Sequence, residues 1–191
     1  MLAIHLFVSH AECTDSVFIY VMEEVFVNKV ANSGLITFNL EEYFPVGERK
    51  YIDIKDILFM GMVLKEKDFR DWVKTHEWSE YQNCFIAIGC SADAIVPTWA
   101  YMLMTAKLSG IANEVVFGDL QSLEAVLWRN ALSKVDLTPF VEGKIVVKGC
   151  GDLPVTAAAY SEITRLLAPM VKSIMYGEPC STVPVFKSKV I

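Results

Sequence analysis

A turn that contains glycine and cysteine joins an apolar strand to a largely apolar helix, and this junction constrains the fold more than any other stretch. The strand is predicted over 84–88, the turn begins at Gly89-Cys90-Ser91, and the helix is predicted over 94–108. A short strand that is apolar at every position is typical of a sheet covered on both faces. The helix is shorter than the roughly 20 apolar residues that cross a membrane. The chain is therefore predicted to surround a buried sheet with helices.

Strands and helices alternate along the rest of the chain. Apolar residues in alternation or in short continuous runs predict strands over 35–40, 51–55, 84–88, 115–117 and 145–147. Apolar residues at helical spacing predict helices over 65–74, 94–108, 120–134 and 155–176, the last of which Pro169 should kink or split. Because this alternation indicates βαβ units, the predicted class is α/β, three-layer, with a largely parallel sheet flanked by helices. The N-terminal strands are left open between parallel and antiparallel, and we recognise no internal repeat.

The length of 191 residues predicts a single α/β domain, which we place at 22–191. Residues 1–21 look unlike the rest, and Met22, which two glutamates follow, is a candidate initiator. We therefore expect residues 1–21 to be a non-native or flexible N-terminal extension. The alternative is an ordinary N-terminal strand.

Charge and cysteine content exclude several classes of protein. The net charge of −6 gives no positive surface for nucleic acid, and no segment predicts a membrane span. Five cysteines are present, and an odd number without close spacing argues against a secreted, disulfide-bonded protein. We therefore expect a cytoplasmic protein that binds neither nucleic acid nor membranes.

Two turns place a Gly-Cys pair at the carboxyl end of a predicted strand: Gly89-Cys90 and Gly149-Cys150. Ligands of open α/β sheets bind at this edge. If both strands belong to one parallel sheet, the two thiols lie at the same edge. We expect the tail 177–184, which contains Cys180, to fold back over that edge and bring a third thiol to it.

A thiol site at this edge is the function that we favour. Three thiolates could hold zinc or an iron–sulfur cluster, or carry sulfur, with a carboxylate as a further ligand. A helix N-terminus beside a thiol would favour the thiolate. The alternative is that each cysteine packs as a small hydrophobic residue. The candidate residues are Cys90, Ser91, Asp93, Cys150, Asp152, Glu178, Cys180, Ser181 and Thr182, of which Cys90, Cys150 and Cys180 are the candidate metal ligands.

An anion or small-ligand pocket is a second hypothesis. Backbone N–H groups at predicted helix starts near 93 and 153 would hold a phosphate or a carboxylate. Three hydroxyl side chains would assist them: Ser91, Ser181 and Thr182.

A non-enzymatic interaction module is the third hypothesis. Its contact face, with a homo-oligomer as one outcome, would be formed by Trp78, Trp99, Trp128 and residues 102–104, which otherwise belong to the core. His76 is predicted to pack or to end a helix instead of acting as a base. Because no catalytic residue is nominated, whether the protein is an enzyme stays open.

Five stretches carry a resemblance to a known family: 27–34, 64–70, 90–101, 116–120 and 171–184. They resemble a bacterial family catalogued as a domain of unknown function, number 2480, and the similarity runs from about Met22 to the C-terminus. The resemblance implies a small cytoplasmic protein and supports the later start. It carries no established activity, but it implies iron–sulfur assembly proteins as partners.

Overall fold

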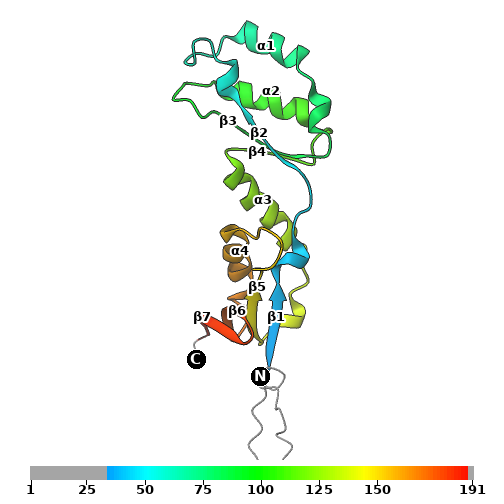
Figure 1. Cartoon of the computed structure of the whole chain (residues 1–191), viewed down its shortest axis with the longest axis vertical. Coiled ribbons are helices and arrows are strands. Elements are labelled where there is room, and N and C mark those ends of the chain that lie inside the picture. Colours follow the sequence, from blue (N-terminus) through cyan, green and yellow to red (C-terminus); the bar gives the residue numbers. More distant parts are fainter. Residues whose placement is uncertain (1–33, 189–191) are drawn as a thin grey trace, which may run out of the picture.

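The computed structural model describes residues 34–188, and the strands in this part of the chain form two sheets (Figure 1). The four-stranded sheet has the order β1-β5-β6-β7, with β1 (Leu35–Asn39), β5 (Lys144–Lys148), β6 (Ser173–Glu178) and β7 (Ser181–Lys187). The three-stranded sheet has the order β2-β3-β4, with β2 (Arg49–Asp53), β3 (Phe85–Gly89) and β4 (Glu114–Phe117). Every pair is parallel except β6–β7. The predicted α/β class is confirmed, but its strands are divided between two sheets.

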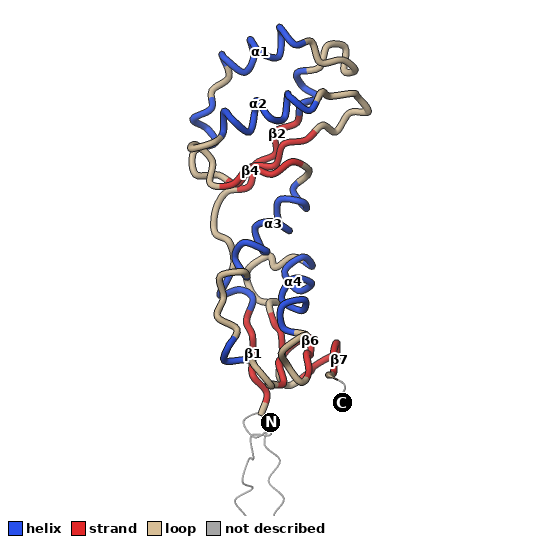
Figure 2. Tube along the Cα trace, turned by 180° about the vertical axis from the view of Figure 1, so that it is seen from behind, coloured by secondary structure: helices blue, strands red, loops and turns tan. Residues whose placement is uncertain are grey.

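Four α-helices lie against these sheets in residues 34–188: α1 (Glu66–Thr75), α2 (Thr98–Leu108), α3 (Leu120–Leu132) and α4 (Ala157–Leu167). The molecule is elongated, with α1 and α2 beside the three-stranded sheet at one end and α4 beside the four-stranded sheet at the other (Figure 1). Helix α3 lies between the two ends, and the view from behind shows the same arrangement (Figure 2).

Helices α1 and α2 bury one face of the three-stranded sheet. Phe69 of α1 and Met104 of α2 are fully buried against Ile86 and Ile88 of β3. These side chains alternate with Ala87, which points to the opposite face because successive strand residues do so. The β3 strand is therefore apolar on both faces, as the sequence predicts.

Helix α3 joins the two sheets because its buried residues form two contacts. Leu123 and Leu127 pack on Ala87, on the second face of the three-stranded sheet. The next residue, Trp128, and Leu132, one turn beyond it, belong to the core of the four-stranded sheet. Helices thus cover both faces of the three-stranded sheet, which gives three layers.

A short ion pair also fixes α3 to β2. Nε of Arg49 lies 2.7 Å from Oε1 of Glu124, and both side chains are mostly buried. The Arg49 guanidinium also lies over the rings of Phe44 and Phe85. Aromatic faces favour a cation in this position, which stiffens the chain where it passes from one sheet to the other.

Two units of the described chain share one order of elements: strand, 3₁₀ helix, α-helix, 3₁₀ helix, strand, α-helix, strand. The inner unit consists of β2, η2 (Ile54–Ile57), α1, η3 (Trp78–Tyr81), β3, α2 and β4. The outer unit consists of β1, η1 (Leu40–Tyr43), α3, η4 (Thr138–Phe140), β5, α4 and β6, and it adds β7. The inner unit is inserted in the outer unit between η1 and α3.

Local details repeat at the first strands of the two units. Asn39 ends β1 and Asp53 ends β2, and each side chain accepts a hydrogen bond from the backbone N–H two residues later. In both units this Asx cap starts the 3₁₀ helix, and the first residue of that helix is buried.

Details also repeat before the middle strands. Asn83 and Glu142 both adopt a left-handed conformation, with φ of 59° and 58°. Their N–H groups donate to the carbonyls of Ile111 and Met170, each three residues beyond the second helix of its unit. The expectation of no internal repeat is therefore wrong, because the repeat lies in backbone geometry and little of it in residue identity.

The ends of the chain differ from the sequence predictions in two ways. The N-terminal strands β1 and β2, left open above, are parallel to their partners. The helix predicted over 155–176 is wrong beyond residue 167, since α4 ends at Leu167 and β6 begins at Ser173. Pro169 has no N–H for a helical hydrogen bond, and the apolar residues after it belong to a strand.

None of the helices in residues 34–188 combines the length and the apolar character needed to cross a membrane. The extension predicted at 1–21 lies outside the described residues. The single domain predicted at 22–191 stays a prediction.

If α3 joins the two sheets, shortening one of its buried residues should destabilise the whole protein. We expect Leu123→Ala to lower the free energy of unfolding by about 2–5 kcal/mol, because it leaves a cavity against Ala87. Chemical denaturation measures this change. The control is Gln121→Ala, an exposed residue of the same helix, which should change stability by less than about 0.5 kcal/mol. Equal effects of the two substitutions would contradict the role given to α3.

Candidate functional site

A cysteine with two tyrosine hydroxyls on its sulfur lies at the carboxyl end of β5. Cys150 Sγ is 3.3 Å from the hydroxyl of Tyr176, at the end of β6, and 3.5 Å from that of Tyr160, on α4. The two tyrosine rings meet edge to face, with centroids 5.3 Å apart. This cysteine is exposed and forms no disulfide with any described residue. The arrangement therefore presents an accessible sulfur between two hydroxyl groups.

The hydroxyl groups favour the ionised thiol. Hydrogen bonds from Tyr176 and Tyr160, with a smaller contribution from the Gly149 backbone, lower the pKa of Cys150 against partial burial and the nearby Glu178 carboxylate. Burial and its hydrogen bond to Cys150 raise the pKa of Tyr160, and a separate hydrogen bond to Cys150 raises the pKa of Tyr176. Both tyrosines thus stay neutral, so each can donate a hydrogen bond to a thiolate.

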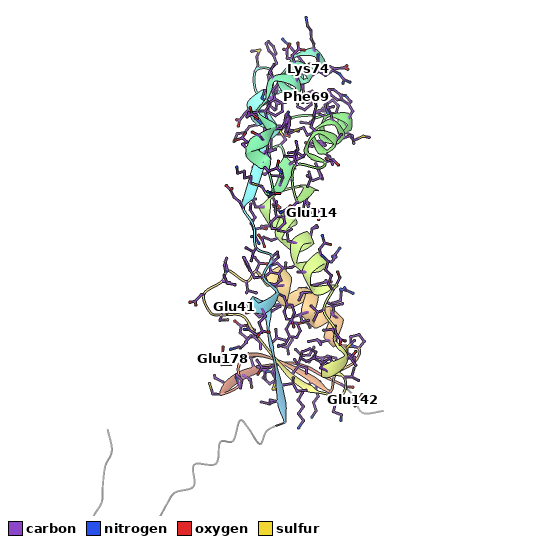
Figure 3. All side chains as sticks on the ribbon, turned by 90° about the vertical axis from the view of Figure 1, so that its right-hand side faces the viewer. Glu41, Phe69, Lys74, Glu114, Glu142 and Glu178 are labelled. Atoms are coloured by element: carbon purple, nitrogen blue, oxygen red, sulfur yellow. The ribbon has the colours of Figure 1, made fainter. Side chains whose placement is uncertain are left out.

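Neighbouring groups hold the loop that carries this cysteine. Glu41, in the 3₁₀ helix after β1, accepts a hydrogen bond from the N–H of Leu153 at 3.1 Å, and its carboxylate lies against Gly151. Lys148 Nζ is 3.7 Å from Oε2 of Glu178. Glu41 and Glu178 lie on the same side of the outer unit, opposite Glu142 (Figure 3). This side is the carboxyl edge of the four-stranded sheet.

A small pocket borders the two tyrosines. It has a volume of about 300 Å³ and is mostly apolar, with three hydroxyl-bearing residues from α4. Its lining residues come from the sheet and from α4: Val147, Tyr160, Ser161, Thr164, Ile174, Met175, Tyr176 and Val185. A small group bound to the sulfur would have space there.

The inner unit repeats this arrangement with one change. Tyr101 and Tyr160 are both the fourth residue of their helices, and Tyr101 packs edge to face on Phe117 as Tyr160 does on Tyr176. Cys90 follows β3 as Cys150 follows β5, and burial, with a smaller effect of the nearby Cys90, raises the pKa of Tyr101. However, Phe117 has no hydroxyl, and Sγ of Cys90 donates to the carbonyl of Ala92 at 3.6 Å.

The expectation that Cys90 and Cys150 share one sheet edge is wrong. Cys90 follows a strand of the three-stranded sheet and Cys150 follows a strand of the four-stranded sheet. Within residues 34–188, no three His, Cys, Asp or Glu side chains are grouped so that they could hold a metal ion. The three-cysteine metal or cluster site with Cys90, Cys150 and Cys180 is therefore not formed by the described residues.

The tail does fold back at one of these edges. Strands β6 and β7 form a hairpin in which Glu178 pairs with Ser181 and Gly177 pairs with Thr182, so that Cys180 lies in the turn. Since β6 runs parallel to β5, this turn belongs to the same edge as Cys150. The carboxylate of Glu178 opposes ionisation of the Cys150 thiol, as described above.

The helices begin later than the sequence predicts, and this overturns the anion site at helix starts near 93 and 153. Helix α2 begins at Thr98 and α4 at Ala157. Each start follows a proline, Pro97 or Pro154, and the residue before a proline disfavours helical geometry. Neither Asp93 nor Asp152 caps a helix, because the N-cap positions are Pro97 and Thr156.

Ser91 has a structural role instead. Its backbone N–H and its hydroxyl both donate to the carboxylate of Asp53, at 3.0 and 2.6 Å. The Lys55 backbone N–H donates to the same carboxylate, and Lys55 Nζ lies 3.2 Å from it. Burial opposes ionisation, but these hydrogen bonds outweigh it and lower the pKa of Asp53 to about 2. Asp53 therefore ties the carboxyl ends of β2 and β3 together.

The aromatic residues of the third hypothesis are mostly packed. Trp128 is fully buried, while Trp78 and Trp99 are partly buried around α1. His76 ends α1 and stacks on Trp72, as predicted, with Nε2 3.0 Å from the Tyr81 hydroxyl. Met104 is buried, but Met102 is 67% exposed.

The sequence analysis missed Tyr160 and Tyr176. A signal was present, since Tyr176-Gly177-Glu178 matches Phe117-Gly118-Asp119 in kind, and both glycines have φ above +110°. The first tripeptide forms the end of β6, and the second begins at the last residue of β4, so each lies at the end of the third strand of its unit. Recognition of this repeat would have placed an aromatic residue beside each cysteine.

The sequence profile of the family described as "Protein of unknown function (DUF2480)" matches residues 24–188. The chain therefore belongs to this family, as the resemblance predicts. No curated protein and no solved structure shows a significant match to the chain.

The clamp at Asp53 predicts a pH dependence of stability. The pKa of its carboxyl is lowered from 3.8 to about 2 in the folded protein, which corresponds to about 2 kcal/mol of stabilisation. This stabilisation is present above pH 3.8 and is lost as the pH falls through about 2. We expect Asp53→Asn to destabilise the protein by up to about 2 kcal/mol at pH 7, and the difference from wild type to vanish near pH 2.

Denaturant unfolding of both proteins between pH 2 and 7 measures this difference. Asp56→Asn, at an exposed carboxylate of η2, is the control and should have an effect below about 0.5 kcal/mol at every pH. A constant destabilisation by Asp53→Asn across this range would show that packing, and not the charge, is responsible.

Proposed function

We propose that this DUF2480 protein is a thiol-exchange protein in which the Cys150 thiolate attacks the sulfur–sulfur bond of a small disulfide. The observation that carries the proposal is the pair of tyrosine hydroxyls on Cys150 Sγ. Hydrogen bonds to sulfur favour the thiolate, and the thiolate is the nucleophilic form of cysteine. Exposure of the sulfur gives the disulfide access.

The proposed step is a single exchange. The Cys150 thiolate attacks one sulfur of R–S–S–R, a new bond forms between Sγ and that sulfur, and the old S–S bond breaks. The departing R–S⁻ takes the electron pair and a proton from water, so the protein ends as the mixed disulfide Cys150–S–S–R. A second thiol from solution reverses the step. No metal or external oxidant takes part.

The surroundings of Cys150 support this chemistry better than the surroundings of Cys90 do. The pocket of about 300 Å³ beside the two tyrosines offers apolar contacts and hydroxyl groups to the R group. Tyr160 and Tyr176 would donate to the thiolate and then release the sulfur once it is bonded and neutral. At Cys90 the thiol donates to the carbonyl of Ala92, and Phe117, which has no hydroxyl, occupies the position equivalent to Tyr176.

The compartment and the partner follow from the same chemistry. We place the protein in the cytoplasm, where small thiols keep exposed cysteines reduced, in accord with the free thiols of Cys84, Cys90, Cys150 and Cys180. The proposed partner is a small thiol or disulfide. Nucleic acid and lipid are not required by this chemistry, and the net charge of −6 does not favour either.

The hydroxyl groups should control the reactivity of the thiol. We expect Tyr160→Phe and Tyr176→Phe each to slow the reaction of Cys150 with 5,5′-dithiobis(2-nitrobenzoate) at pH 7 by about two- to fourfold. Loss of a hydrogen bond reduces the thiolate fraction, while the gain in intrinsic nucleophilicity offsets part of that loss. The double variant should be slowest, and its pH–rate profile should move to higher pH. Stopped-flow absorbance gives the rates, and peptide mass spectrometry identifies the cysteine.

Tyr101→Phe is the matched control, since it removes the equivalent hydroxyl in the inner unit and should leave the Cys150 rate unchanged. Cys150→Ser should abolish the fast phase. The proposal fails if Cys150 reacts no faster than Cys90 and Cys180, or if the double Tyr→Phe variant keeps the wild-type pH profile.

A further inference from the structure

The two units differ most at the outer edge of their third strand. In the outer unit, β7 pairs antiparallel with β6, and Val185 of β7 lines the pocket next to Tyr160 and Tyr176. In the inner unit, the equivalent strand β4 has no neighbour on its outer edge among residues 34–188. The equivalent pocket, which Tyr101 and Phe117 line, is open and measures about 900 Å³ instead of about 300 Å³. The inner unit therefore has a vacant place where the outer unit has a strand.

The edge of β4 has few of the features that keep strand edges from pairing. Such features include lysine, proline and other residues that disturb an added strand. The outer strand β7 contains Pro184 and Lys187, and β2 begins with Arg49-Lys50. Strand β4 reads Glu-Val-Val-Phe and ends in Phe117, which is 71% exposed. Its free edge is thus the most suitable of these three for strand addition.

The helix beside β4 also has an uncovered apolar face. Helix α2 carries one charged residue, Lys107, and is apolar or weakly polar around the rest of its circumference. A helix of this composition is normally buried on all sides. Here Met102, Thr105 and Ala106 are exposed and line the open pocket, together with Ser109 just beyond the helix. The exposed face contains small residues, which allow another helix to approach closely.

We propose that a second copy of this chain occupies the vacant place, with β4 paired antiparallel to β4 of the partner about a two-fold axis. In a symmetric register, Val116 faces Val116 of the partner subunit and Val115 faces Phe117 of the partner subunit, because paired residues of antiparallel strands point to the same face of the sheet. No like charges oppose each other in this register. The two three-stranded sheets would become one sheet of six strands, in which the added strand is antiparallel to β4 as β7 is to β6.

The spacing of the helices fits this dimer. Helix α2 connects β3 to β4 and lies over that pair, so each α2 would be about one strand spacing from the two-fold axis. The two α2 helices would then be about 10 Å apart, close to the 8–10 Å at which helices pack. A self-complementary edge also closes after two copies and leaves no edge for a fibre. A second copy therefore satisfies strand pairing and helix packing at once.

The test uses the full chain and its oligomeric state. We expect sedimentation velocity at 1–100 μM to show a dimer, and Phe117→Asp to weaken it at least about tenfold, because the new carboxylate faces the apolar Val115 of the partner subunit. Phe117→Leu keeps an apolar side chain at this position and should retain most of the dimer. Circular dichroism shows whether each variant folds.

Val183→Asp is the matched control, since it places the same charge at an exposed apolar residue of the edge strand β7 and should leave the dimer intact. A wild-type monomer at 100 μM would overturn the proposal and leave the edge of β4 to a different protein. A dimer that Phe117→Asp does not weaken, or that Phe117→Leu weakens just as strongly, would also overturn it. Cys150 lies in the other unit, so its reactivity with disulfides is judged independently.

Discussion

The parallel pairing of β1 with β5 is the contact on which the rest of the architecture depends. Leu35 pairs with Lys144 and Asn39 with Lys148, so two segments far apart in sequence close a loop that contains the whole inner unit. The entropy cost of such closure rises only slowly with loop length. The insertion is compatible with this pairing because β2, β3 and β4 have their own core with α1 and α2. Helix α3 then joins this core to that of the outer unit through adjacent turns.

The repetition of one unit explains why two similar sulfur environments occur in one chain. In both units the middle strand ends in a Gly-Cys turn, the second helix places a tyrosine at its fourth residue, and the third strand supplies an aromatic ring. The replacement of a tyrosine by Phe117 in the inner unit removes one hydroxyl from the set. The Cys150 thiol contacts two tyrosine hydroxyls, whereas the Cys90 thiol donates to the backbone carbonyl of Ala92.

The two units also differ in what covers the outer edge of their third strand. The outer unit uses its C-terminal hairpin to cover β6, and the turn of that hairpin places Glu178 near Cys150. The inner unit continues from β4 directly into α3, because Asp119 caps this helix by accepting the N–H of Ser122 at 2.8 Å. The chain that could have covered β4 is thus used to connect the two cores. The segment after the third strand thus covers the sheet edge in the outer unit, as β7, and joins the two sheets in the inner unit, as α3.

The sequence by itself determined the elements and their class, and only the tertiary structure decided which elements meet. Apolar periodicity placed β3, β5 and α1 well, since these features depend on neighbours in the chain. The same periodicity wrongly extended α4 through Pro169, because Ile174 and Met175 suit a helix face and a strand equally well. The division into two sheets was not predictable from apolar strands alone, since β3 and β5 are both short strands with apolar central residues and nothing in them specifies their partners. The hydroxyls of Tyr160 and Tyr176 meet Cys150 through strand pairing and helix packing, and those long-range contacts leave no pattern in residue spacing.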